Sequence, residues 1–200
     1  MFQIRKYGHY SQYFHFLKKD LNNIETFRTI KKWSFGKILE IGCGIGYISA
    51  YLGAEYGIDN NSKVIAVAKK LYPHTAFIVG DSTNLPFKPD QFNTVVCYNV
   101  LEHLTNSEIE KTLFEVKRVL KNDGVFLVGY SDLTYWGYHI IEIIKGKDPT
   151  HCQRWSRMDF SILIKKFFTV IEKKNTSGYG YCTWLSRFCK GDIVLKCCKN

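Results

Sequence analysis

A glycine-rich turn joins a predicted strand to a predicted helix in the first quarter of the chain. In KILEIGCGIGYISAYL, residues 37–52, an apolar run that carries Glu40 is followed by Gly42, Gly44 and Gly46. Glycine lets a backbone approach a ligand closely and adopt left-handed dihedral angles. A strand, a glycine turn and a helix in this order are typical of a nucleotide-like binding site in an α/β fold.

The spacing of these glycines argues against two common nucleotide sites. A dinucleotide fold of the NAD type uses the pattern G-x-G-x-x-G, and here Tyr47 stands where its third glycine would be. A P-loop requires Gly-Lys-Ser or Gly-Lys-Thr, which does not follow Gly46. The expected ligand is therefore nucleotide-like but neither NAD nor a P-loop nucleotide.

Apolar strand candidates alternate with amphipathic helix candidates after this turn. Strands are expected at 37–41, 55–59, 76–80, 94–98, 125–130, 167–174 and 192–198, and helices at 47–52, 62–71, 107–120 and 159–166. Lys121–Val125 (KNDGV) is expected to end the third of these helices, because a cation and a glycine suit a helix C-terminus. The pattern predicts an α/β, Rossmann-like fold with a seven-stranded, mostly parallel sheet and helices on both faces.

Two regions fall outside this alternation. Residues 1–35 have aromatic and apolar side chains at three- and four-residue spacing and predict an N-terminal helical cap: Tyr7, Tyr10, Tyr13, Phe14, Leu17, Phe27 and Ile30. Residues 36–200 are expected to form the ligand-binding domain. An insertion is expected at about 131–157, with a short helix near 138–144.

Charge and cysteine content limit the partners and the compartment. The net charge of +10 permits an acidic partner such as nucleic acid, but the lysines occur in scattered pairs, so nucleic acid is not favoured. The seven cysteines are odd in number and contain no CxxC, which favours free thiols and a cytoplasmic protein. No apolar run approaches the ~20 residues that span a membrane. The oligomeric state stays open.

Five ordered blocks resemble one enzyme family. They are EIGCGIG (40–46), YGIDNN (56–61), FIVGDSTNLPFKPDQFNTVVCYNVLEHL (77–104), EVKRVLKNDGVFLVGY (115–130) and DPTHCQRWSRMDFSILIKKFF (148–168). Together they resemble the class I S-adenosylmethionine-dependent methyltransferases, in particular the UbiE-like, type 11 branch that acts on small molecules. The resemblance covers about residues 36–172.

The resemblance implies S-adenosylmethionine as the cofactor, with S-adenosylhomocysteine as its product. Asp59 would accept hydrogen bonds from the ribose hydroxyls, Asp81 would bind the adenine amine, and Ser82 would offer its backbone amide to the ring. Glu40 and Asn99 would lie near the methionine part. The full implied set is Glu40, Gly42, Cys43, Gly44, Gly46, Asp59, Asn60, Asp81, Ser82 and Asn99. Asp81 has an alternative role in capping a turn, and Asn99 an alternative role in satisfying a strand end.

The acceptor is less constrained than the cofactor. CYNV (97–100) stands where enzymes that methylate adenine or glutamine amines carry Asp/Asn-Pro-Pro-Tyr. The expected acceptor is therefore a small-molecule oxygen, nitrogen or carbon atom, reached by direct in-line displacement. Tyr10, Tyr13, Tyr130 and Tyr135 are candidates for an aromatic acceptor pocket. An RNA or protein methyltransferase, or a non-catalytic subunit with this fold, is the alternative.

No catalytic group is fixed by the sequence. A general base is needed only if the acceptor must lose a proton, and the candidates are His103, Asp132, His139 and His151. LEHL recurs in the family regardless of substrate, which favours a structural role for His103. Nothing resembles the metal-binding carboxylates of the catechol type, so no metal is expected.

Overall fold

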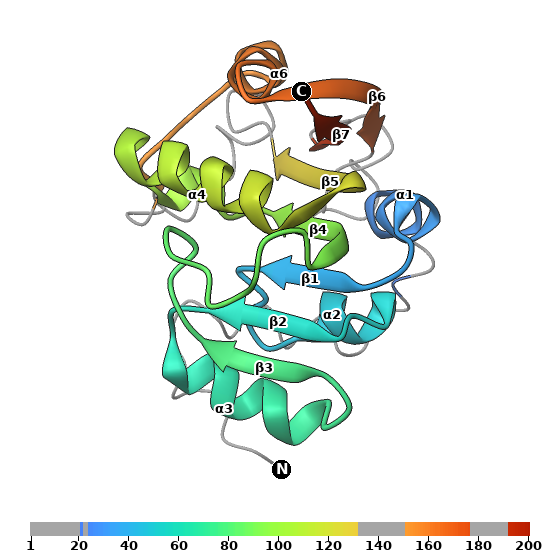
Figure 1. Cartoon of the computed structure of the whole chain (residues 1–200), viewed down its shortest axis with the longest axis vertical. Coiled ribbons are helices and arrows are strands. Elements are labelled where there is room, and N and C mark those ends of the chain that lie inside the picture. Colours follow the sequence, from blue (N-terminus) through green and yellow to red (C-terminus); the bar gives the residue numbers. More distant parts are fainter. Residues whose placement is uncertain (1–20, 22–23, 132–150, 177–191) are drawn as a thin grey trace, which may run out of the picture.

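The structure is a computed structural model that describes residue 21 and residues 24–131, 151–176 and 192–200. Its centre is one sheet of seven strands in the order β3-β2-β1-β4-β5-β7-β6 (Figure 1). The strands are β1 (Ile38–Ile41), β2 (Tyr56–Asp59), β3 (Ala76–Val79), β4 (Phe92–Tyr98), β5 (Leu120–Ser131), β6 (Phe168–Thr176) and β7 (Asp192–Lys199). Strands β1 to β5 pair in parallel, and β7 is antiparallel to both β5 and β6. The predicted Rossmann-like, mostly parallel sheet is confirmed.

Helices cover both faces of this sheet, as the alternation predicts (Figure 1). They are α1 (Glu25–Trp33), α2 (Tyr47–Leu52), α3 (Ser62–Leu71), α4 (Asn106–Val119) and α6 (Arg157–Lys165), with a short 3-10 helix η3 (Leu101–His103). Helices α1 and α2 bury Phe27, Ile30 and Ile48 against one face of the sheet. Helices α4 and α6 bury Leu113 and Phe160 against the other. Burial of these apolar stripes on a near-continuous apolar sheet is the main source of stability.

One helix ends differently from the expectation. The KNDGV stretch is predicted to close α4 with a glycine, but the helix ends at Val119 and Leu120 is already extended. Leu120 pairs with Phe92 of β4, so the stretch begins β5 instead. Gly124 serves close packing there, because a Cβ at this position would lie 3.0 Å from the carbonyl oxygen of Asn93. Strand pairing therefore outweighs the local sequence signal that predicts a helix end.

The described part of the predicted N-terminal cap packs directly on the sheet. Thr26 of α1 hydrogen-bonds the Thr176 hydroxyl at 2.6 Å and donates to the Asp192 carboxylate at 3.3 Å. Asp192 is buried and also accepts from the Tyr98 hydroxyl at 2.5 Å and from the Ser131 hydroxyl at 2.9 Å. Buried carboxylates need such donors, and this network ties α1 to four strands. The predicted helix near 138–144 and the aromatic positions before residue 21 lie outside the described residues.

Two further sequence predictions concern the cysteines and membrane-spanning segments. The described cysteines, Cys43, Cys97, Cys152, Cys197 and Cys198, are all free thiols, as expected. Among the described residues, no helix has the length and apolar character that crossing a membrane requires.

Candidate active site

The sheet order reverses at β1, which has β2 on one side and β4 on the other. In open α/β sheets, ligands bind outside the carboxyl ends of the strands at such a switch point. The glycine turn follows the carboxyl end of β1, Asp59 ends β2, and Asn99 follows β4. The fold therefore brings three separate parts of the predicted cofactor set to one edge of the sheet.

The three glycines of the turn have positive φ angles but differ in what surrounds them. The φ angles are 67° at Gly42, 53° at Gly44 and 82° at Gly46. A Cβ on Gly42 would lie 2.3 Å from Val100, and one on Gly46 would lie 2.4 Å from Phe77. A Cβ on Gly44 would meet no atom within 4 Å. Gly42 and Gly46 therefore allow close packing, while Gly44 leaves open space beside the turn.

Asp59 connects the end of β2 to this turn. Its Oδ2 accepts a hydrogen bond from the Gly44 amide at 3.0 Å, and its Oδ1 accepts one from the Asn61 amide at 2.9 Å. Burial raises the pKa of the Asp59 carboxyl, while the two amide bonds and the charge of His103 act in the opposite direction. A carboxylate has about four acceptor positions, so Asp59 can accept further hydrogen bonds from a ligand.

Glu40 lies inside the protein, on the central strand β1. It is 2% exposed and accepts a hydrogen bond from the Ser49 hydroxyl of α2. Burial raises the pKa of Glu40 to about 8, against the lowering effect of the bonds from Ser49. Its carboxyl group is therefore held between the sheet and α2. The sequence does not identify Ser49 as the partner of Glu40, because only its position in the first turn of the predicted helix distinguishes it.

The other predicted cofactor residues differ in how exposed their side chains are. The Cys43 thiol is buried in a cluster with Ile65 and Phe77, where burial raises its pKa, so only its backbone can face a ligand at the turn. Asn60 is exposed. Asp81 is also exposed, and its Oδ1 accepts from the Thr83 amide at 2.8 Å.

Two further predicted residues link neighbouring elements. The Ser82 hydroxyl hydrogen-bonds the Thr112 hydroxyl of α4 at 2.9 Å. Asn99 has a positive φ of 52°, and its side-chain oxygen accepts from the Ser131 amide at 3.1 Å while its NH2 donates to the Ser131 hydroxyl at 3.2 Å. The Asn99 side chain thus joins the ends of β4 and β5. The turn-capping contact of Asp81 and the strand-end contact of Asn99 are both present, and the backbones of these residues stay at the same sheet edge.

The catalytic and acceptor candidates are only partly described. Tyr130 is predicted to line an acceptor pocket, but it is fully buried and its ring packs on Phe160 at 5.1 Å and on Trp155 at 5.3 Å between centroids. Its hydroxyl accepts a hydrogen bond from the Trp155 amide at 3.0 Å. Tyr130 is therefore a core residue. Asp132, His139, Tyr10, Tyr13 and Tyr135 lie outside the described residues.

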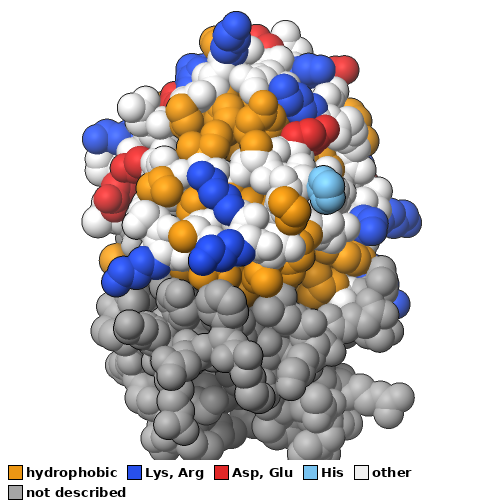
Figure 2. Space-filling model, turned by 90° about the horizontal axis from the view of Figure 1, so that it is seen from below, with side chains coloured by type: hydrophobic (Ala, Val, Ile, Leu, Met, Phe, Trp, Pro, Cys, Tyr) orange, Lys and Arg blue, Asp and Glu red, His pale blue; other side chains and the backbone are white. Residues whose placement is uncertain are grey.

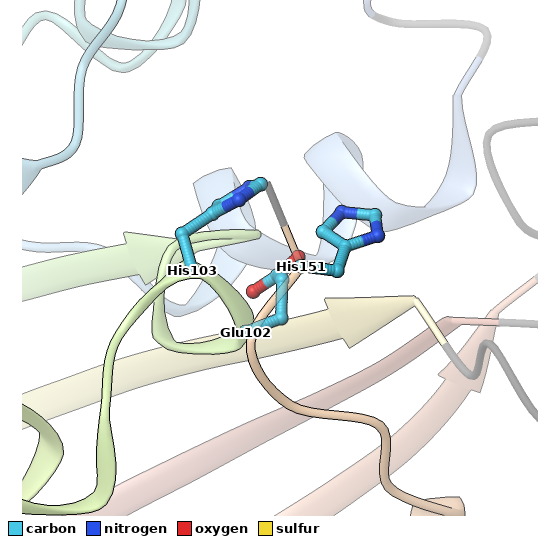
Figure 3. Close-up of side chains that lie close together, drawn as sticks. All are labelled: Glu102, His103 and His151. Atoms are coloured by element: carbon cyan, nitrogen blue, oxygen red, sulfur yellow. The ribbon is translucent and has the colours of Figure 1, made fainter. Parts of the chain in front are cut away.

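His103 and His151 come together despite their distance in the sequence. Their ring centroids lie 4.8 Å apart with an interplanar angle of 39°, and Glu102 lies beside them (Figure 3). One ligand-type atom from each of Glu102, His103 and His151 lies within 4.8 Å of the others. Glu102 is not among the sequence candidates, because its place before His103 gives no sign that a distant histidine joins the pair.

Comparison with known proteins agrees with this geometry. Residues 39–128 match a family model described as a methyltransferase domain. YcgJ of Bacillus subtilis, an uncharacterised methyltransferase, is 33% identical over an alignment of 101 residues, and the match covers 46% of this chain and 39% of that protein. Norajmaline N-methyltransferase of Rauvolfia serpentina is 32% identical over an alignment of 93 residues, and the match covers 41% of this chain and 31% of that enzyme. The chain spans less than half the length of both relatives.

A solved structure shares the fold over nearly the whole chain. It is a Thermotoga maritima SAM-dependent methyltransferase described as a possible histamine N-methyltransferase. The two superpose with a TM-score of 0.74 at 20% identity, over 98% of each chain. At this identity the likeness is one of fold.

Proposed function

We propose that this chain, whose residues 39–128 belong to the type 11 branch of the class I S-adenosylmethionine-dependent methyltransferases, is an enzyme that methylates a small molecule. The reaction is a direct in-line displacement at an oxygen, nitrogen or carbon atom of the acceptor. The observation that carries the proposal is the bond from the Gly44 amide to Asp59. It joins an open glycine turn to a carboxylate that has acceptor positions left for a ribose.

The residues at the sheet edge fit S-adenosylmethionine. Gly44 has open space where any other residue would place a Cβ, so the backbone of the turn can approach the cofactor. Asp59 is fixed by two backbone amides, and its remaining lone pairs would accept hydrogen bonds from the ribose hydroxyls. Asp81 lies one strand further along, after β3, where it would meet the adenine amine. Glu40 and Asn99 support the methionine end of the site from β1 and β4.

The cofactor, when bound, supplies a methyl group that is already activated on a sulfonium. The chain's own residues then act by positioning, because they hold the cofactor in one orientation, hold the acceptor behind the methyl group and exclude water. The rigid groups at the sheet edge suit this role, since Asp59 and Asn99 are each fixed by hydrogen bonds to backbone amides.

A small acceptor is favoured over RNA by two observations. Norajmaline N-methyltransferase, a relative, is named for a small molecule. On the described part of the face seen in Figure 2, lysine and arginine side chains stand apart, separated by apolar, acidic and other side chains, whereas RNA binding there would need a continuous basic stripe. A cytosolic location is part of the proposal, and the free thiols of Cys43 and Cys97 support a reducing compartment.

The proposal is tested by transfer of a labelled methyl group. The chain is mixed with methyl-labelled S-adenosylmethionine and a cell extract that is separated into metabolite, RNA and protein fractions. We expect label in a metabolite, and much less of it with the Asp59→Ala variant at the same subsaturating cofactor concentration. Label in the RNA or protein fraction would refute the small-molecule acceptor, and no transfer to any fraction would refute the enzyme.

A further inference from the structure

Three metal-ligand side chains meet at the carboxyl end of β4. Glu102 and His103 lie in η3, and His151 begins the described segment that precedes α6. Figure 3 shows the three side chains gathered between these two segments. One carboxylate oxygen and one nitrogen from each imidazole lie within 4.8 Å of one another. None of these three residues belongs to the predicted cofactor-binding set.

Backbone hydrogen bonds hold the two segments together. The amides of Cys152 and Gln153 donate to the carbonyl oxygen of Glu102 at 2.8 and 3.0 Å. The Gln153 side chain donates to the carbonyl oxygen of Leu104 at 3.3 Å and to Asn106 at 3.0 Å. His151 therefore enters the cluster on a segment that is docked on η3. A site whose ligands are positioned by the fold loses less entropy when an ion binds.

The chemistry of the donor set suits a transition metal. Imidazole nitrogens and carboxylate oxygens are common ligands of Zn²⁺, at about 2.0–2.2 Å from the ion. Ligand atoms around a tetrahedral ion of this size are roughly 3.4 Å apart. Since the present atoms lie within 4.8 Å, side-chain rotation that closes about 1.4 Å or less would complete the site.

The three side chains of the cluster differ in how exposed they are. The Glu102 side chain is only 3% exposed, while His103 and His151 are half-buried. Buried carboxylates are stabilised by cations or by hydrogen-bond donors. Two half-buried histidines beside a buried carboxylate leave access from solvent on the imidazole side, which an entering ion needs.

We propose that Glu102, His103 and His151 bind a divalent transition-metal ion of the zinc type, with one coordination position left for water or another ligand. Two histidines and one carboxylate with an open fourth position are the ligand set of many zinc sites that hold a reacting molecule. The site lies at the same carboxyl edge of the sheet as Asp59, since η3 follows β4 and Asp59 ends the parallel strand β2. If the proposed methyl transfer holds, an acceptor oxygen, which keeps a free lone pair when bound to the ion, is the natural fourth ligand.

The test is binding of Zn²⁺ alone, measured on the full chain by competition with a chromophoric chelator. We expect one tight site per chain. The variant His151→Ala should weaken it by at least about tenfold, and Glu102→Gln, which keeps the shape of the buried side chain, should weaken it as well. His74→Ala, at an exposed histidine of the 71–75 connection, is the matched control and should leave the affinity unchanged.

A second measurement separates this cluster from the cysteines. Co²⁺ in place of Zn²⁺ should give the visible bands of a nitrogen- and oxygen-ligated ion, without the near-ultraviolet absorption of a thiolate ligand. Cys152→Ser, next to His151, should not change the affinity. The proposal is overturned if no stoichiometric site is found, if His151→Ala binds as tightly as wild type, or if Co²⁺ shows thiolate ligation. Because no cofactor is present in these titrations, failure of the methyltransferase proposal would leave their outcome unchanged.

Discussion

The Asp59 carboxylate accepts a hydrogen bond from the Gly44 amide at 3.0 Å, and this bond joins the end of β2 to the glycine turn after β1. Two elements of the predicted cofactor site therefore form one rigid unit before any ligand binds. Because Asp59 also accepts from the Asn61 amide at 2.9 Å, its carboxylate plane is fixed. Preorganised acceptors of this kind lower the entropy cost of binding a ribose.

Replacing Asp59 with alanine should weaken S-adenosylmethionine binding by tenfold or more. A hydrogen bond to a charged group contributes about 1.5–3 kcal/mol, and about 1.4 kcal/mol corresponds to tenfold in affinity. The variant Asp59→Asn keeps an oxygen that can accept a hydrogen bond from the Gly44 amide. It therefore shows how much of the lost affinity comes from removing the charge rather than from disturbing the glycine turn. Calorimetric titration measures the affinity, and thermal unfolding checks that the fold is retained.

The matched control for Asp59→Ala is Asp123→Ala. Asp123 is an exposed acid near the start of β5, at the opposite end of the strand from the sheet edge that carries the site. This variant removes the same charge and should bind the cofactor like wild type. Wild-type affinity in Asp59→Ala would remove Asp59 from the site.

Gly44→Ala and Gly53→Ala should lose similar stability but differ in cofactor binding. Both glycines have positive φ, 53° and 73°, and a Cβ at either meets no atom within 4 Å. An L-residue in this conformation costs roughly 1–2 kcal/mol. Only at Gly44 would the new methyl group occupy the space proposed for the cofactor. Denaturant unfolding and calorimetry on both variants test this, and equal affinity in the two would contradict the placement.

Gly42→Ala should be more destabilising than Gly44→Ala, because its Cβ would lie 2.3 Å from a Val100 methyl group. Shortening that neighbour with Val100→Ala should recover part of the loss. In a double-mutant cycle the two changes should couple by about 0.5 kcal/mol or more. Additive effects on the free energy of unfolding would show that the clash with Val100 is not what requires glycine at this position.

The stability of the protein should fall between about pH 5 and pH 8 because of Glu40. Burial raises its folded-state pKa to about 8 from the ordinary 4.5, so the folded protein keeps a proton that the unfolded chain releases. The contribution is complete below about pH 4.5 and is lost as the pH rises through about 8. The expected size is a few kcal/mol. Denaturant unfolding at several pH values measures it.

Glu40→Gln stays neutral at every pH and should flatten this fall. Glu110→Gln makes the same chemical change at an exposed position of α4 and should follow the wild-type curve. If Glu40→Gln has the same pH dependence as wild type, the Glu40 carboxyl is ionised in the folded protein near neutral pH.

Local signals predict those elements whose ends depend on nearby residues. Helix α3 begins and ends as expected, at Ser62 and Leu71. Its start is set locally, since the Asn61 side chain accepts a hydrogen bond from the amide of Lys63 at 3.0 Å. The glycine turn is equally local, because its positive φ angles favour glycine on their own. The predicted start of β5 is wrong. The strand begins at Leu120, whose pairing partner Phe92 lies in β4 and is distant in the sequence.

Long-range contacts explain the other differences from the sequence predictions. Tyr130 resembles a pocket residue in its place at the end of β5, but Trp155 and Phe160 cover its ring. The approach of His151 to His103 is also invisible in the sequence, since it depends on how the segment before α6 docks on η3. The docking of distant segments follows from packing, which residue spacing does not encode.

Calorimetric titration of the unmodified chain with S-adenosylhomocysteine tests the central claim most directly, because it needs no knowledge of the acceptor. The account predicts saturable binding of one molecule per chain, with competition by S-adenosylmethionine and no measurable binding of NAD. Absence of binding by both S-adenosylhomocysteine and S-adenosylmethionine to the folded chain would contradict it.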